Sequence, residues 1–219
     1  RIKDFKRSFT LSKNHVDEVK HILNLFGIPT IENISEADPL CSHLAKKKEI
    51  YAVLSEDMDI LTFGSPILIR GLSGNKNVKE INLKIVLDKL KLNQNEFIDL
   101  CILLGCDYCP TIPKIGMKKA FDIIQKYKSI DIFLEKEGKK YNIPEDFNYI
   151  EARNIFINPS IKKTSNKFKL NKPKYNDIKE IMVDIYDFNL DKVNNYLNKI
   201  KSAYLKSQNG GFNKINCNI

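Results

Sequence analysis

Two short apolar runs, residues 51–54 and 67–69, lie between segments whose apolar residues recur at helical spacing. An uninterrupted apolar run of this length is typical of a strand that is covered on both faces. Residues 27–31 predict a further strand, which follows the first helical segment. Because strands that alternate with helices form βαβ units, the sequence predicts an α/β fold with a mostly parallel sheet flanked by helices.

Apolar residues repeat every three or four positions through much of the chain, which predicts helices. The first begins after Ser12 and ends at Gly27. Residues 158–176 are polar, rich in lysine and without a period, so we expect an extended connector there. The other predicted helices are 35–47, 83–90, 97–104, 117–127, 178–185 and 193–204.

Composition narrows the class of protein. Lysine and arginine number 36 against 27 acids, and this net charge of +9 favours a polyanionic partner, nucleic acid before an anionic membrane. No apolar run approaches the roughly 20 residues that span a bilayer, and the basic N-terminus is not followed by the apolar stretch of a secretory signal. The odd number of cysteines, five, favours reduced thiols in an intracellular protein.

One cysteine spacing needs an alternative interpretation. Cys101, Cys106 and Cys109 have the spacing of a plant-type ferredoxin [2Fe–2S] site, and the only later cysteine is Cys217. The residues between the first two read as the buried end of a helix and not as a loop around a cluster, so buried or idle thiols are favoured. Zinc at Cys106 and Cys109 stays an alternative, although no histidine lies at zinc spacing.

Five acids occupy positions from which they can meet. Glu36 and Asp38 open a predicted helix, Asp57 and Asp59 directly follow a predicted strand, and Asp107 follows the helix that ends near residue 104. In an open parallel sheet, ligands collect beyond the carboxyl ends of the strands. Ionised carboxylates that meet need a cation among them, and an all-carboxylate set selects Mg²⁺ or Mn²⁺ over zinc. Two such ions about 4 Å apart stabilise the attacking water and the leaving oxygen of a phosphodiester.

Each acid also has a purely structural interpretation. Ser35 and Asp38 have the spacing of a capping box, which would explain Asp38 and its neighbour Glu36. Asp57 and Asp59 could solvate the end of a strand, and Asp107 could be a turn residue. Three other acids are interpreted as surface residues: Glu56, Asp88 and Asp99.

Two other motifs compete for Asp57 and Asp59, and both fail on spacing. A phosphatase of the haloacid dehalogenase type needs threonine two residues after the second aspartate, and here Thr62 comes one residue too late. An EF-hand loop needs Asp or Asn and then Gly where this chain has Leu61 and Thr62.

A basic turn precedes the helix predicted at 117–127. It contains Lys114 and Gly116 and opens onto Lys118 and Lys119. Backbone N–H groups at such a helix start can hold a phosphate, which would also offset the unfavourable position of two lysines against the helix dipole. The alternative is an ordinary solvated turn; Lys126 and Lys128 extend the basic track with weaker support.

These motifs occur together in one family. The stretches ISEAD, YAVLSEDMDILTFGSPILIRGL and NQNEFIDLCILLGCDYCPTIPKIGMKKA resemble, in order and spacing, the flap endonuclease family of structure-specific 5′ nucleases. The resemblance is strong over roughly residues 8–130 and weak in the late helices. It implies a PIN-like 5′-nuclease core, here incomplete, and a Mg²⁺-dependent 5′ flap endonuclease and 5′–3′ exonuclease of DNA replication and repair.

The resemblance assigns roles to the acids and to the basic turn. Asp57, Asp59 and Asp107 match family ligands of a second metal ion, and Glu36 and Asp38 match the acidic pair that serves the first. The basic turn resembles a helix–two-turn–helix that holds duplex DNA and often a K⁺ ion. Its DNA-binding residues would be Lys114, Gly116, Lys118 and Lys119.

The chain departs from the family in three ways. The family has Glu-Ala where this chain has Asp38-Pro39, so the shorter Asp38 is expected to reach its metal through water. The family's N-terminal region, with two further metal-binding aspartates and the helical arch, has no counterpart, so we expect a fragment that cuts DNA weakly or not at all. A sliding clamp is a possible partner, but its binding motif is not found, and residues 208–212 match it poorly.

The resemblance also predicts the partners of the protein and how the chain is divided into parts. Flapped or branched duplex DNA is the expected partner of a monomeric protein with no membrane contact, nuclear if the source is eukaryotic. The alternative function is a non-catalytic duplex-DNA-binding module, and a third is a phosphohydrolase of small phosphates. The predicted parts are 1–105 (nuclease core), 106–130 (helix–two-turn–helix), 131–205 (C-terminal helical region) and 206–219 (flexible tail).

Overall fold

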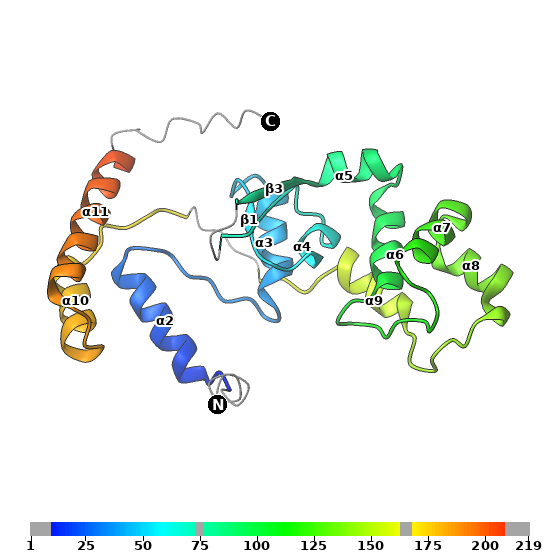
Figure 1. The fold of residues 1–219 in the computed structure, drawn as a ribbon, viewed down its shortest axis with the longest axis horizontal. Coiled ribbons are helices and arrows are strands. Elements are labelled where there is room, and N and C mark those ends of the chain that lie inside the picture. The colour runs from blue at the N-terminus through cyan, green and yellow to red at the C-terminus, as the bar shows by residue number, and fades with distance from the viewer. Residues whose placement is uncertain (1–9, 73–76, 163–167, 209–219) are drawn as a thin grey trace. The chain divides into compact units, whose positions relative to one another are not determined.

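The computed structural model describes residues 10–72, 77–162 and 168–208. Contacts divide the chain into two compact units, which we describe separately. The larger comprises residues Glu32–Ser165, and the smaller comprises Arg1–Ile31 with Asn166–Ile219 (Figure 1). The boundaries predicted at residues 105, 130 and 205 separate parts with different expected functions and not compact units, so they stay a prediction.

The larger unit contains a three-stranded sheet in the order β1-β2-β3. Strand β1 (Val53–Leu54) runs parallel to β2 (Ile67–Arg70), with Val53 opposite Leu68, as the sequence predicts. Strand β3 (Lys79–Asn82) runs antiparallel to β2, so the described sheet is mixed. The segment between β2 and β3 is too short for the crossover that a parallel neighbour requires. The α/β class is confirmed.

The strand predicted at 27–31 is wrong, because these residues form no strand. Gly27 has a left-handed backbone (φ +74°), and a Cβ atom there would lie 2.1 Å from the carbonyl oxygen of Asn171. The Gly27 carbonyl accepts a hydrogen bond of 2.8 Å from the Asn171 N–H. This segment therefore packs against another part of the smaller unit and not into a sheet.

Three helices of this unit, which follow one another along the chain between residues 37 and 90, contact the sheet, and the later helices extend beyond it. All four helices predicted between residues 35 and 127 are present, while two further helices, α8 and α9, lie in a region predicted only as helical overall. Helix α6 begins with a capping box in which Asn93 and Glu96 satisfy each other's backbone N–H groups. The helices are α3 (Ala37–Lys46), α4 (Asp59–Thr62), α5 (Leu83–Leu90), α6 (Gln94–Leu104), α7 (Met117–Tyr127), α8 (Ile130–Glu137) with a 3₁₀ turn (Gly138–Lys140), and α9 (Tyr149–Ile157).

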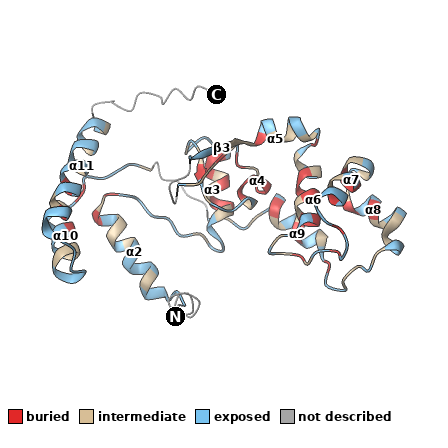
Figure 2. Cartoon of the chain, viewed as in Figure 1, coloured by how far each residue is buried: buried red, intermediate tan, exposed pale blue. Residues whose placement is uncertain are grey.

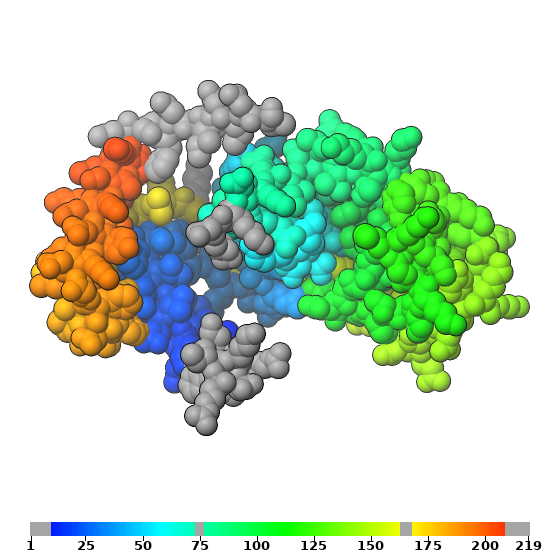
Figure 3. All heavy atoms as spheres, viewed as in Figure 1, coloured from blue at the N-terminus to red at the C-terminus, as the bar shows by residue number. Residues whose placement is uncertain are grey.

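Two groups of buried side chains form the core of the larger unit. One joins the sheet to α4 through Val53, Ile60 and Leu68, and the other joins α6 to α9 through Ile102 and Phe156 (Figure 2). Leu90 packs against both groups. The sheet and the helices of this unit accordingly form one continuous body of atoms (Figure 3). This body is the scaffold that carries every predicted site residue.

Asp99 is not the surface acid that the sequence suggested, because it is only 2% exposed. Its two carboxylate oxygens accept hydrogen bonds of 2.7 Å from Nε and Nη2 of Arg153, and one of them also accepts the N–H of Ile130 at 2.9 Å. Arg153 binds Asp131 as well, at 2.7 Å. The carboxylate of Asp99 can be buried here because the partly exposed Arg153 binds it through two parallel hydrogen bonds and the Ile130 N–H donates to it as well.

The smaller unit is helical. Leu25, Ile178, Val193 and Leu197 form its core. None of the helices in the described ranges is long and apolar enough to cross a membrane. The smaller unit contains α2 (Lys13–Leu25), α10 (Tyr175–Glu180) and α11 (Leu190–Gln208). Ser12 caps α2, and α10 continues into a π-helical turn (Ile181–Ile185). These bounds are close to those predicted from the sequence.

Candidate metal and nucleic-acid site

Glu36 and Asp38 stand at the N-terminus of α3. Glu36 is the N-cap residue and makes no capping hydrogen bond, while the hydroxyl of Ser35 donates to the carbonyl oxygen of Ser160 at 3.3 Å. The capping box predicted as an alternative for Ser35 and Asp38 is therefore wrong. Burial of Pro39 and Leu40 fixes the helix on the core and leaves the two acids toward solvent, Glu36 exposed and Asp38 half-buried.

Asp57 and Asp59 lie between β1 and α4. The N–H of Asp57 donates to Ser55 Oγ at 3.0 Å, and the N–H of Asp59 donates to Asp57 Oδ1 at 2.9 Å. Asp57 thus stabilises the turn with one oxygen and keeps the other available. Asp59 is the first residue of α4, half-buried beside the fully buried Ile60.

Asp107 is exposed in the loop between α6 and α7. Its neighbours Cys106 and Cys109 face each other in an isolated antiparallel bridge. Gly105, just before this bridge, has a φ of +112°, and a Cβ atom there would lie 3.0 Å from Thr111 Cγ2. The loop therefore needs glycine at 105 to turn back after α6.

Electrostatics link the five predicted acids. The pKa of Asp59 is raised to about 6, first by burial and then by the charges of the other four acids, in the order Asp57, Asp107, Asp38 and Glu36. Burial also raises the pKa of Asp38, followed by the charges of Asp57 and Glu36. The structure thus brings together acids from three separated segments, while their role as metal ligands stays a prediction.

The five acids gather without forming a coordination shell. Among the described residues, no group of three or more His, Cys, Asp or Glu side chains is arranged to hold a metal ion. The two findings are compatible, because a carboxylate can shift the pKa of another from as far as about 10 Å, whereas a Mg²⁺ ion must have its ligand oxygens at about 2.1 Å. Because Mg²⁺ usually retains several waters and takes only one or two carboxylates directly, this all-oxygen set fits it through partly water-mediated contacts.

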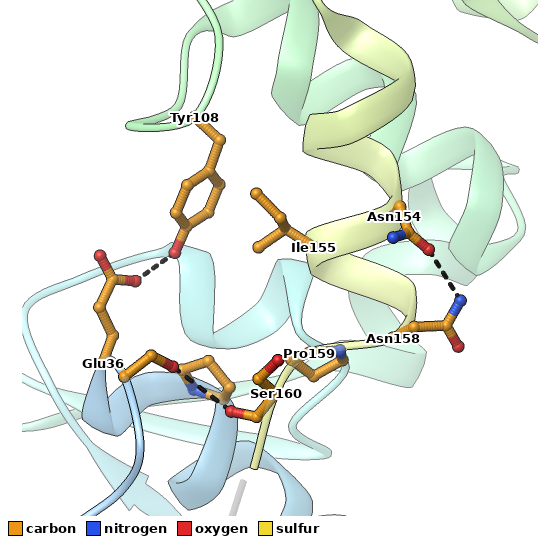
Figure 4. Close-up of a pocket in the computed structure, with 9 residues that line it drawn as sticks. Glu36, Tyr108, Asn154, Ile155, Asn158, Pro159 and Ser160 are labelled. Carbon is orange, nitrogen blue, oxygen red and sulfur yellow. Dashed lines mark hydrogen bonds between the residues drawn. The ribbon is translucent and has the colours of Figure 1, made fainter.

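Tyr108 is a site residue that the sequence did not single out, although it directly follows Asp107. Its hydroxyl donates to the carboxylate of Glu36 (Figure 4). Burial raises the pKa of Tyr108, and the hydrogen bond to Glu36 raises it further, so the hydroxyl keeps its proton. A pocket of about 330 Å³ lies beside this pair, lined by Ser35, Glu36, Pro39, Tyr108, Asn154, Ile155, Asn158, Pro159 and Ser160.

The cysteines near the acids are unpaired thiols. Burial raises the pKa of Cys101 to about 12 and that of Cys109 to about 11. Burial also raises the pKa of Cys106. Thiols with such pKa values stay protonated and unreactive at neutral pH, which favours the buried-thiol interpretation over a cluster or zinc site. Cys217 lies outside the described residues.

The basic turn has an open helix start. Gly116 is the N-cap of α7, makes no side-chain cap, and has no atom within 4 Å of where a Cβ would stand. The first turn of α7 contains no acid, and Lys118 and Lys119 are exposed there. The left-handed residue of the turn is Lys114 (φ +68°). Backbone N–H groups and two lysines therefore face solvent at a site that suits a phosphate.

Two lysines of the predicted basic track have partners in the protein. The Nζ of Lys119 lies 5.6 Å from the ring centre of Tyr141, a contact that leaves its charge available. Lys126 packs over Tyr127 and lies 3.4 Å from Glu137. Lys126 is therefore partly neutralised, in accord with its weaker support as a DNA contact.

Most of the chain is similar in sequence to known proteins. Residues 27–107 match the family model of the XPG I-region. The chain is 40% identical to flap endonuclease 1 of Entamoeba histolytica over 94% of its own length and 56% of that protein's, and 38% identical to flap endonuclease 1 of Mus musculus with the same coverage. It thus spans little more than half the length of the curated relatives it matches.

Solved structures agree on the fold. A flap endonuclease from Methanococcus jannaschii has a TM-score of 0.77 and 31% identity, over 89% of this chain and 59% of that one. The catalytic core of Rad2 in complex with a DNA substrate has a TM-score of 0.79 over 90% of this chain and 71% of that one. At 20% identity, this second likeness concerns the fold alone.

Proposed function

We propose that this protein is a structure-specific 5′ flap endonuclease and 5′–3′ exonuclease of DNA, because the chain is 40% identical to flap endonuclease 1 of Entamoeba histolytica over 94% of its length. The observation of the structure that carries this proposal is the gathering of four acids from three separated segments around Asp59, close enough for their charges to raise its pKa. Like charges held this close repel one another and destabilise the fold, and a divalent cation bound among them removes that repulsion.

The proposed reaction is hydrolysis of a phosphodiester with two divalent metal ions, Mg²⁺ by preference. When bound, such ions lower the pKa of a water and stabilise the charge that develops on the phosphate. Asp57, Asp59 and Asp107 would hold one ion, and Glu36 and Asp38 the other. Asp38 would do so through water, because its side chain is short and half-buried.

The basic turn would hold the duplex beside the cut. Lys118 and Lys119 offer charge to backbone phosphates, and the open N–H groups that follow Gly116 offer hydrogen bonds. Contacts of this kind position DNA without reading its sequence, so recognition would rest on DNA shape. A K⁺ ion at the carbonyls of this turn belongs to the same proposal.

We further propose that these 219 residues hold only part of the catalytic ligand set. The chain spans 56% of the length of a relative such as the Entamoeba histolytica enzyme. No three of the described acids can hold a metal ion alone. Additional ligands from the part of the relatives that this chain does not match would complete the coordination.

The metal proposal is tested by Asp57→Asn combined with Asp59→Asn. Asparagine retains the shape and the turn hydrogen bond from the Asp59 N–H, but removes two charges. We expect Mn²⁺ affinity, measured by electron paramagnetic resonance, to fall at least about a hundredfold, beyond the range typical of residues that only support a ligand. The matched control is Asp88→Asn, an exposed acid on α5 that does not contribute to the pKa of Asp59.

The same variant should not lose stability without metal. The folded-state pKa of Asp59, about 6, lies above its ordinary value of 3.8, so ionisation destabilises the fold as pH rises through this window. Removing that charge should leave the melting temperature at pH 7.5 in EDTA unchanged or higher. Unchanged Mn²⁺ affinity would instead support the non-catalytic DNA-binding module, in which these acids only stabilise turns.

Duplex binding is tested by replacing Lys118 and Lys119 with alanine. If both contact phosphates, the slope of log affinity against log salt should become shallower by about 1–2, and binding should weaken equally for unrelated sequences. Fluorescence anisotropy with two duplexes of different sequence measures this. The control pair, Lys84→Ala with Lys89→Ala on α5, removes the same charge from exposed positions. Equal slopes for both pairs would contradict a specific role for the α7 turn.

A further inference from the structure

Tyr108 connects all three segments that carry the acids. It directly follows Asp107, and its hydroxyl donates to the carboxylate of Glu36, which lies 72 residues earlier in the chain. Figure 4 shows the tyrosine side chain reaching from its loop to the start of α3, where this carboxylate lies. Since Glu36 makes no capping hydrogen bond to its own helix, the tyrosine holds a carboxylate that α3 does not hold itself.

The third connection runs through the aromatic ring. The ring centre of Tyr108 lies 5.2 Å from that of Phe156 and 6.4 Å from that of Phe63, both in edge-to-face arrangements. Phe63 directly follows α4, and its N–H donates to the carbonyl oxygen of Asp59 at 2.8 Å. The ring therefore packs against the segment that carries Asp59 and is itself fixed by α9.

The backbone of Glu36 is held separately from its side chain. Asn33 donates to the Glu36 carbonyl oxygen at 2.7 Å and accepts the N–H of Lys162 at 2.8 Å. These bonds keep the main chain in place if the tyrosine hydroxyl is removed. What the hydroxyl alone controls is the orientation of the carboxylate.

We propose that Tyr108 is a positioning residue that orients the Glu36 carboxylate toward the acid cluster and leaves its second oxygen available for a divalent cation. This inference rests on the proposed metal-dependent function. Outer hydrogen bonds of this kind fix the rotamer of a ligand, and their loss typically weakens metal binding ten- to hundredfold. The ring of Tyr108 packs against Phe63 and Phe156, whereas its hydroxyl orients the Glu36 carboxylate, so a mutation can remove one role and keep the other.

The experiment compares Tyr108→Phe, Glu36→Gln and the double variant, using Mn²⁺ as the probe and the 219-residue chain. We expect Tyr108→Phe to weaken Mn²⁺ binding about tenfold with little change in melting temperature, because the ring remains. In the Glu36→Gln background, the same substitution should have no further effect on Mn²⁺ binding, since the carboxylate it orients is gone.

The control variant is Phe133→Leu, which loosens the core at a fully buried aromatic side chain of α8 whose ring contacts Tyr127 and Tyr141. It should lower the melting temperature and leave Mn²⁺ affinity of the folded chain within about twofold. If Tyr108→Phe binds Mn²⁺ as the wild type does while Glu36→Gln binds it more weakly, the positioning role is overturned and the metal site survives. The partial ligand set is expected to bind Mn²⁺ weakly, so a folded wild-type chain that binds no Mn²⁺ up to millimolar concentration overturns the proposed metal site first, and this inference with it.

Discussion

Replacing Arg153 with methionine is expected to cost the larger unit about 3–5 kcal/mol of folding free energy. Methionine fills similar space but leaves the carboxylate of Asp99, 2% exposed, without its bidentate partner. The Ile130 N–H cannot by itself compensate a buried charge. The melting temperature should fall by about 10 °C or more, measured by circular dichroism.

The matched control is Lys140→Ala, which removes an ion pair of 3.2 Å with Glu137. The lysine side chain of this pair is 68% exposed, so solvent screens the pair and the melting temperature should hardly change. A second variant, Arg153→Lys, keeps the positive charge but not the two parallel hydrogen bonds, so its loss of stability should lie between those of Lys140→Ala and Arg153→Met. A loss below about 1 kcal/mol in Arg153→Met would contradict the stabilising role given to this bidentate pair.

The isolated 219-residue chain is expected to cut a 5′-flap DNA at least about 10³-fold more slowly than a full-length flap endonuclease such as the Methanococcus jannaschii enzyme. A factor of 10³ corresponds to about 4 kcal/mol of transition-state stabilisation, which is modest for loss of metal ligands. The reason is that the described acids gather without any three forming a metal-binding group. A gel assay with labelled flap substrate and Mg²⁺ measures the rate.

The control for that assay is Asp59→Asn in the same chain. Residual cutting that this substitution abolishes belongs to the acid cluster, and cutting that it leaves unchanged comes from a contaminating nuclease. A wild-type chain that cuts as fast as the full-length enzyme would contradict the proposal that further ligands are required.

Most of the helices, though not α4, α8 and α9, were predictable because their signals are local. Ser12 before α2 and Asn93 with Glu96 at α6 are satisfied within one turn, and apolar residues three or four apart repeat along each helix. The acids were predictable in the same way, since each stands at the end of a strand or helix. Their electrostatic contact followed from the expectation that such ends meet at one edge of the sheet.

Features that depend on distant partners were not predictable. The antiparallel direction of β3 and the irregular path after Gly27 depend on neighbours in space. Asp99 looks like any helical acid until α9 brings Arg153, 54 residues later, into contact with it. Tyr108 and Glu36 are 72 residues apart.

The division between the two kinds of feature has a physical cause. A helix, a cap or a charged position is encoded by residues within about one turn of chain, so the order of amino acids settles where α3, α6 and the acids lie. Burial of Asp99 and orientation of Glu36 depend on which surfaces pack together. That choice depends on the free energy of the whole core, which no short window of sequence contains.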